Sequence, residues 1–141
     1  MRKLKMLAVL AIAIASCTNE TNQPQEQTPT LDALTRSTIL TELETNLTEE
    51  MGIPIKYESS EVINIEGTYY LRARSAEYVT TTMLAVDAIG VLVGIGVSCT
   101  SRSCAQSTTG CIPNFAEGEL IPTCTKCTEG TKDCKRTITS S

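Results

Sequence analysis

Apolar residues recur with a helical period between positions 31 and 51. In the second half of this segment they are spaced by three, four and four positions: Leu40, Leu43, Leu47 and Met51. This spacing predicts an amphipathic helix whose apolar face packs on a sheet, with a partner-binding helix as the alternative. Thr28 or Thr30 is expected to cap its start, with Asp32 in the first turn, and Gly52 to end it.

The hydrophobic period changes to two after this helix. Alternating or β-rich segments cover 53–57, 62–65, 69–74 and 78–86, and Glu66-Gly67 separates two of them as a turn. Alternation interrupted by turn residues is typical of an antiparallel meander with one face on a core. We therefore expect a small antiparallel sheet after the helix.

The most hydrophobic stretch beyond residue 30 is Ile89–Val97, which contains three glycines, Gly90, Gly94 and Gly96. Its length of nine residues is too short to span a bilayer as a helix. The favoured interpretation is a buried central strand in which glycine marks a bulge or a close contact. Periodicity leaves a buried helix open as the alternative.

The first 16 residues have the pattern of an export signal. Arg2, Lys3 and Lys5 precede Met6–Ala15, an unbroken apolar run of ten residues. A positive segment followed by a short apolar core is typical of a secretory signal peptide and is too short to be a transmembrane helix.

Ile14-Ala15-Ser16-Cys17 resembles the lipobox of bacterial lipoproteins: an aliphatic residue, two small residues and a cysteine. Ile14 stands where leucine is commonest and Ser16 where glycine or alanine is commonest. The resemblance implies that residues 1–16 are removed and that Cys17 carries a diacylglyceryl thioether and an N-acyl chain such as palmitate. Several acyl chains are enough for stable membrane anchoring. Thr18 favours the outer membrane under the enterobacterial sorting rule, and an ordinary secretory signal is the alternative.

Thr18–Thr30 contains no aliphatic or aromatic residue. Such a composition buries too little apolar surface to order itself, so residues 17–30 are expected to be a lipidated cysteine followed by a disordered tether. Fully extended, the tether reaches about 43 Å from the membrane.

Charge and composition exclude several functions. The 141 residues carry 12 basic and 16 acidic side chains, and removal of residues 1–16 leaves a formal charge of −7. Nucleic acid is therefore not an expected partner, because phosphate binding needs a basic surface. The chain has no histidine, which excludes Ser-His-Asp and Cys-His catalysis. We expect no enzymatic activity, name no catalytic residue and expect no cofactor or metal.

Seven cysteines divide into Cys17 and six in the C-terminal segment: Cys99, Cys104, Cys111, Cys124, Cys127 and Cys134. In an exported chain, six cysteines within a loop-like segment predict three disulfides, for which fifteen pairings are open. The alternative is a metal, iron–sulfur or redox site at Cys124-x2-Cys127, since this spacing suits ligands and redox pairs.

Arg72 and Arg74 share one face of a predicted strand. Guanidinium groups bind carboxylate or phosphate bidentately, so one interpretation is an anion site. The favoured interpretation is a solvated face on which these arginines pair with acids such as Glu61, Glu66 or Glu77.

These observations predict an α+β fold. An N-terminal helix packed on an antiparallel sheet occupies 31–98, and an irregular disulfide-rich segment of the same domain occupies 99–141. The expected function is that of a lipid-anchored protein of the bacterial cell envelope, exported and held in the outer membrane. We expect it to act as a non-enzymatic binding or structural module for an envelope protein or ligand. Two alternatives are a Cys-x-x-Cys redox or metal-binding protein and a small inhibitor of an envelope-targeting hydrolase.

Overall fold

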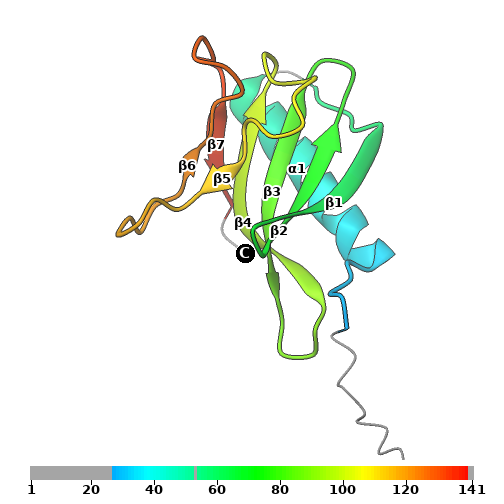
Figure 1. Ribbon diagram of the computed structural model, residues 1–141. Coiled ribbons are helices and arrows are strands. Elements are labelled where there is room, and N and C mark those ends of the chain that lie inside the picture. The colour runs from blue at the N-terminus through cyan, green and yellow to red at the C-terminus, as the bar shows by residue number, and fades with distance from the viewer. Residues whose placement is uncertain (1–26, 53, 140–141) are drawn as a thin grey trace, which may run out of the picture.

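The computed structural model describes residues 27–52 and 54–139. It is an α+β structure with one helix, α1 (Ala33–Met51), and a five-stranded antiparallel sheet of order β1-β2-β3-β4-β7. The strands of the sheet are β1 (Ser59–Ile65), β2 (Thr68–Arg74), β3 (Val79–Val86), β4 (Leu92–Ser101) and β7 (Lys135–Ile138). A separate two-stranded ladder joins β5 (Pro113–Asn114) to β6 (Thr123–Cys124). The helix lies on one face of the sheet and the β5–β6 ladder on the other (Figure 1).

Helix α1 begins later than the sequence predicts. Its N-cap is Asp32, whose carboxylate accepts hydrogen bonds from the backbone N–H groups of Leu34 at 3.0 Å and Thr35 at 2.9 Å. Thr30 is not the cap, because its carbonyl accepts a 2.9 Å bond from Leu92 N–H and holds this residue extended beside β4. The C-terminal prediction is confirmed: Gly52 adopts φ 66°, the left-handed conformation that ends many helices.

The apolar face of α1 packs on the sheet. Ile39, Leu43 and Leu47 are buried against residues of β2, β3 and β4 that include Leu71, Leu84 and Leu92. The buried stripe is offset from the predicted one, since Ile39 replaces Leu40 and Met51 is only half-buried. Each fully buried aliphatic side chain contributes about 1.5–3 kcal/mol. Among the described residues, no helix is both long and apolar enough to cross a membrane.

The alternating segment at 54–57 is not a strand, which corrects the prediction; Ile53 lies outside the described residues. Here the backbone bonds to helix side chains instead of a neighbouring strand. Tyr57 N–H donates to Glu44 Oε1 at 2.9 Å, and Ile55 N–H donates to Thr48 Oγ1 at 3.5 Å. The alternation arises because Ile55 is buried in the core beneath the helix.

The Glu66-Gly67 turn is confirmed. It joins β1 to β2 with Ile65 opposite Thr68, and both turn residues have positive φ, 50° and 87°. Two consecutive positive φ values suit the right-handed twist of a two-residue hairpin. Gly67 N–H also donates to Asn64 Oδ1 at 3.0 Å, which fixes the turn from its first strand.

The predicted central strand is present, but it is shifted. Strand β4 begins at Leu92 and lies between β3 and β7, while Ile89 is 84% exposed in the turn before it. A register shift near Thr82 marks a β-bulge in the pairing of β3 with β4. Gly96 lies in this bulge with φ 74°, and a Cβ there would be 2.2 Å from the carbonyl oxygen of Thr139. The prediction that glycine marks a bulge or a close contact is therefore confirmed at Gly96, whereas Gly90 lies in the turn before β4 with open space beside it.

The cysteine-rich segment covers the sheet face opposite α1. Ile112 packs against Tyr70 and Met83, and the buried cysteines pack against Val79. The segment is more regular than predicted, because it forms the β5–β6 ladder and ends in β7, which extends the sheet beside β4. The sheet therefore has a core on each side, one built with a helix and one built with disulfides.

Candidate binding loop and its disulfide base

Three disulfides join the six cysteines of the C-terminal segment in the order first to fourth, second to fifth and third to sixth. The bonds are Cys99–Cys124, Cys104–Cys127 and Cys111–Cys134. They enclose sequence separations of 25, 23 and 23 residues. Loops of that length each contribute about 3.5 kcal/mol when closed singly, and less when closed together, because the three loops overlap.

The pairing bears directly on the Cys124-x2-Cys127 motif. Its two cysteines bond to different partners, Cys99 and Cys104, and not to each other. The sulfur atoms of Cys99, Cys124 and Cys134 lie within 4.8 Å of one another, so two disulfides are packed side by side. Metal ligation needs thiolates, and in this pairing all three sulfurs are held in disulfides.

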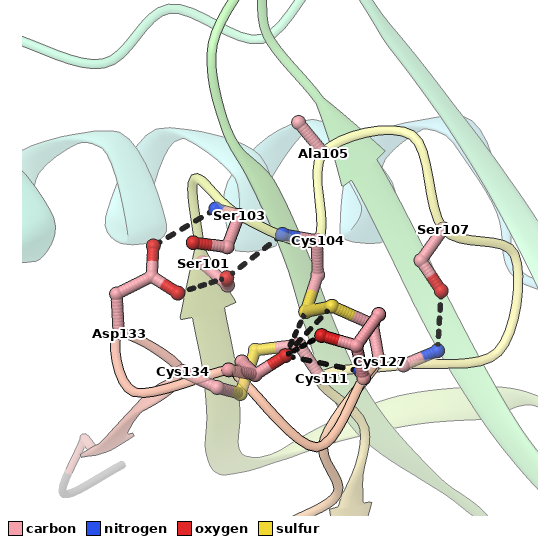
Figure 2. The surroundings of a disulfide bond; sticks show 12 residues. Ser101, Ser103, Cys104, Ala105, Ser107, Cys111, Cys127, Asp133 and Cys134 are labelled. Atoms are coloured by element: carbon pink, nitrogen blue, oxygen red, sulfur yellow. Dashed lines mark hydrogen bonds between the residues drawn. A yellow bond between two sulfur atoms is a disulfide. The ribbon is translucent and has the colours of Figure 1, made fainter.

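The Asp133 carboxylate holds the loop that follows β4 through three hydrogen bonds. It accepts from Ser101 Oγ at 2.8 Å, Arg102 N–H at 2.8 Å and Ser103 N–H at 2.9 Å. Ser101 Oγ in turn accepts from Cys104 N–H at 3.0 Å, as Figure 2 shows. Burial opposes ionisation of Asp133, but these hydrogen bonds outweigh it and lower its pKa. The carboxylate thus fixes the backbone conformation beside the Cys104–Cys127 disulfide.

Arg72 and Arg74 do not form a solvated face, which corrects the favoured interpretation. Arg72 is 1% exposed, and it donates to Thr81 Oγ1 at 2.6 Å, to the Ser107 carbonyl at 2.6 Å and to the Gly110 carbonyl at 3.0 Å. Arg74 donates to the carbonyls of Ala105 and Ser107. The two guanidinium groups therefore bind the 105–110 loop to strand β2.

Arg72 is a buried cation. Burial lowers its pKa to about 10, the positive charge of Arg74 adds to this effect, and Glu61 opposes it. The group stays charged near neutral pH. Among the described residues no carboxylate lies within salt-bridge distance of either arginine, so carbonyl and hydroxyl oxygens take the place of a counter-ion.

The loop between β5 and β6, residues 115–122, extends away from the body of the molecule (Figure 1). It carries three exposed apolar side chains: Phe115 at 43%, Leu120 at 95% and Ile121 at 56% exposure. Glu117 and Glu119 lie among them and are also exposed. Single exposed apolar residues are common, and a group of them on one projection makes this loop a candidate interaction site.

The base of the 115–122 loop is held rigidly. Cys111 N–H donates to the Thr125 carbonyl and Thr125 N–H donates to the Ile112 carbonyl, each at 2.9 Å. Arg136 of β7 donates to the Pro122 carbonyl at 2.7 Å. The disulfides at Cys111 and Cys124 tie both arms to the rest of the fold. The exposed apolar group therefore projects from a fixed support.

Sequence reasoning placed six of its seven site residues here, in the disulfides, and it missed the loop. Phe115, Leu120 and Ile121 follow no period, and the only signal was their isolation in a segment of turn residues. Cys17 and residues 18–26 of the predicted tether lie outside the described residues. Thr30, the last residue of that tether, pairs with Val91.

The chain was also compared with known proteins. No family model, no curated protein and no solved structure matches it.

Proposed function

We propose that this chain is a lipid-anchored protein of the bacterial cell envelope that acts as a non-enzymatic binding module. In this proposal the acyl chains on Cys17 hold it in the outer membrane, and the 115–122 loop contacts a partner protein. The observation that carries the binding role is the exposed apolar group on a loop whose base is closed by disulfides.

Export is supported by the disulfides. Three cross-links in a small chain are typical of an oxidising compartment outside the cytoplasm. The apolar run Met6–Ala15 and the lipobox-like Ile14-Ala15-Ser16-Cys17 agree with this compartment. Export thus rests on two separate features of the chain, and the anchor rests on the second of them.

Binding through the 115–122 loop is favoured by the way its base is held. A fixed base leaves fewer residues to be ordered on binding, so more of the contact energy contributes to affinity. Leu120 is almost fully exposed, and burying it in a pocket contributes about 1.5–3 kcal/mol. Leu120 is therefore the expected anchor of the interface.

The loop also indicates the chemistry of its partner. Glu117 and Glu119 lie beside the apolar side chains, so the complementary surface is an apolar pocket with basic residues at its rim. An envelope-targeting hydrolase with such a pocket is one partner of this kind, and the chain would then act as its inhibitor. The projecting loop on its disulfide-linked base is the observation that favours this second candidate.

Anchoring is tested by expressing the full chain in bacteria with the Cys17→Ala substitution. Unsubstituted protein should incorporate labelled palmitate and sediment with the outer membrane. The Cys17→Ala protein should lose the label and leave the membrane fraction, whereas Thr18→Ala should still be labelled. A Cys17→Ala protein that stays fully membrane-bound would contradict the anchor.

Binding is tested with a photoreactive amino acid placed at position 120 in one strain and at position 89 in another. Ile89 is the matched control, since it is an 84% exposed apolar residue in a different turn. Position 120 should give one discrete protein adduct that position 89 does not give. The purified partner should bind the full chain, and Leu120→Ser should weaken that binding at least tenfold. Identical adducts from both positions would refute the loop as the binding site.

A further inference from the structure

A cavity of about 340 Å³ lies between helix α1 and the bulged part of strands β3 and β4. Its volume falls at the lower end of the range for small-molecule sites. It is separate from the 115–122 loop, which projects from the opposite face of the sheet (Figure 1).

Thr82 lines the cavity and has a buried hydroxyl without a partner among the described residues. Thr82 is 3% exposed, and within the described residues its Oγ1 forms no hydrogen bond. The neighbouring Thr80, on the same strand face, is satisfied by Tyr57 at 2.5 Å and Thr100 at 2.9 Å. A buried polar group without a partner costs about 1–3 kcal/mol. Thr82 lines the cavity, so a bound group that reaches this buried hydroxyl would recover that cost.

The walls supply further polar groups from two elements. Ser98 of β4, which pairs with Thr82 across the sheet, lines the same space. Glu42 and Asn46 line it from α1. Gly94 and Gly96 present only backbone to the cavity, and a Cβ on Gly94 would lie 3.3 Å from Ile39 Cδ1. The absence of a side chain at Gly94 thus leaves space beside Ile39, and polar residues line the same cavity.

The charge of the lining restricts the ligand. The one acidic residue among the described residues that line the cavity is Glu42, which is exposed to solvent, and no lysine or arginine lines it. An anion would meet repulsion without a compensating cation, whereas hydroxyl and amino groups match the oxygen atoms present. We propose that this cavity binds a small, non-anionic molecule that carries hydroxyl or amino groups.

The test uses three two-carbon probes of different charge: ethanolamine, ethylene glycol and glycolate. Binding to the full-length protein in detergent is measured by saturation-transfer difference NMR. Ethanolamine should give the strongest transfer, ethylene glycol a weaker one and glycolate none. Transfer from no probe at millimolar concentration would show that the cavity holds only water and would overturn the proposal. Glycolate transfer equal to that of ethanolamine would overturn it as well.

Two matched variants locate the binding. Thr82→Val keeps the side-chain shape and removes the unpartnered hydroxyl, so it should leave the unfolding midpoint unchanged or raise it. The same variant should weaken ethanolamine binding by about tenfold, the loss of one hydrogen bond. Thr80→Val should instead lower the midpoint and leave binding unchanged. Equal binding by the Thr82→Val and unsubstituted proteins would contradict the site.

Discussion

Replacement of Arg72 by methionine tests whether its buried guanidinium holds the cysteine-rich segment against the sheet. The change removes three hydrogen bonds, to Thr81 Oγ1 and to the carbonyls of Ser107 and Gly110. Arg74 still donates to Ser107, so two acceptors are left without a partner. Each orphaned buried acceptor costs about 1–3 kcal/mol. Removal of a desolvated charge returns part of this cost, and we expect a net loss of about 3 kcal/mol.

Urea unfolding of the oxidised full-length protein, followed by far-ultraviolet circular dichroism, measures this loss. With a slope of about 1.5 kcal/mol per molar urea, the midpoint should fall by about 2 M. Arg72→Lys should lose nearly as much, because one ammonium group cannot replace the planar fork of a guanidinium. Arg74→Met is the matched control and should lose less, since Arg72 keeps the Ser107 bond. An Arg72→Met protein as stable as the unsubstituted one would refute the role of Arg72.

Three further predictions concern the disulfides, the bulge and the loop after β4. Replacing Cys104 and Cys127 together by alanine should lower the free energy of unfolding by up to about 3.4 kcal/mol, from the 23-residue separation, measured in urea without reductant. Gly96→Ala should lower the free energy of unfolding by at least about 2 kcal/mol, measured by thermal unfolding, because φ is positive and the Thr139 carbonyl occupies the Cβ position. Gly90→Ala is the control and should lower it less, because Gly90 also has positive φ but has open space around it. The lowered pKa of Asp133 stabilises the fold above the ordinary aspartate pKa of 3.8, so stability should fall as the pH drops below that value, and Asp133→Asn should flatten this acid dependence.

The parts of the fold that sequence predicts well are those fixed by nearby residues. The end of the helix at Gly52 and the turn at Glu66-Gly67 each need a left-handed backbone, which glycine permits. The helix itself follows from an apolar repeat that needs no knowledge of what it packs against. These features required only local pattern and turn chemistry.

The errors arose where distant residues decide the structure. Strand alternation predicts an exposed Arg72, because it does not show that a loop 35 residues later in the chain covers this side chain. Segment 54–57 alternates like a strand, yet its N–H groups bond to the side chains of Thr48 and Glu44. The pairing of six cysteines among fifteen arrangements likewise depends on how the C-terminal segment folds across the sheet.

The candidate sites likewise differ in whether local sequence or distant contacts determine them. The six disulfide-forming cysteines could be identified by counting cysteines in the sequence, whereas the 115–122 loop and the cavity beside α1 could not be identified from the sequence. An exposed Leu120 and an unpartnered Thr82 hydroxyl are known only from burial and hydrogen bonding in the fold. Both sites depend on contacts between segments that lie far apart in the sequence.

The central proposal is an exported protein with one lipid-bearing cysteine and six paired ones. Intact-mass spectrometry of the native protein, before and after reduction, tests it most directly. We predict loss of residues 1–16, a mass increase at Cys17 from its acyl chains, and a gain of about 6 Da on reduction, two hydrogens for each of three disulfides. A protein that retains residues 1–16 without acyl chains, or that gains no mass on reduction, would contradict the proposal.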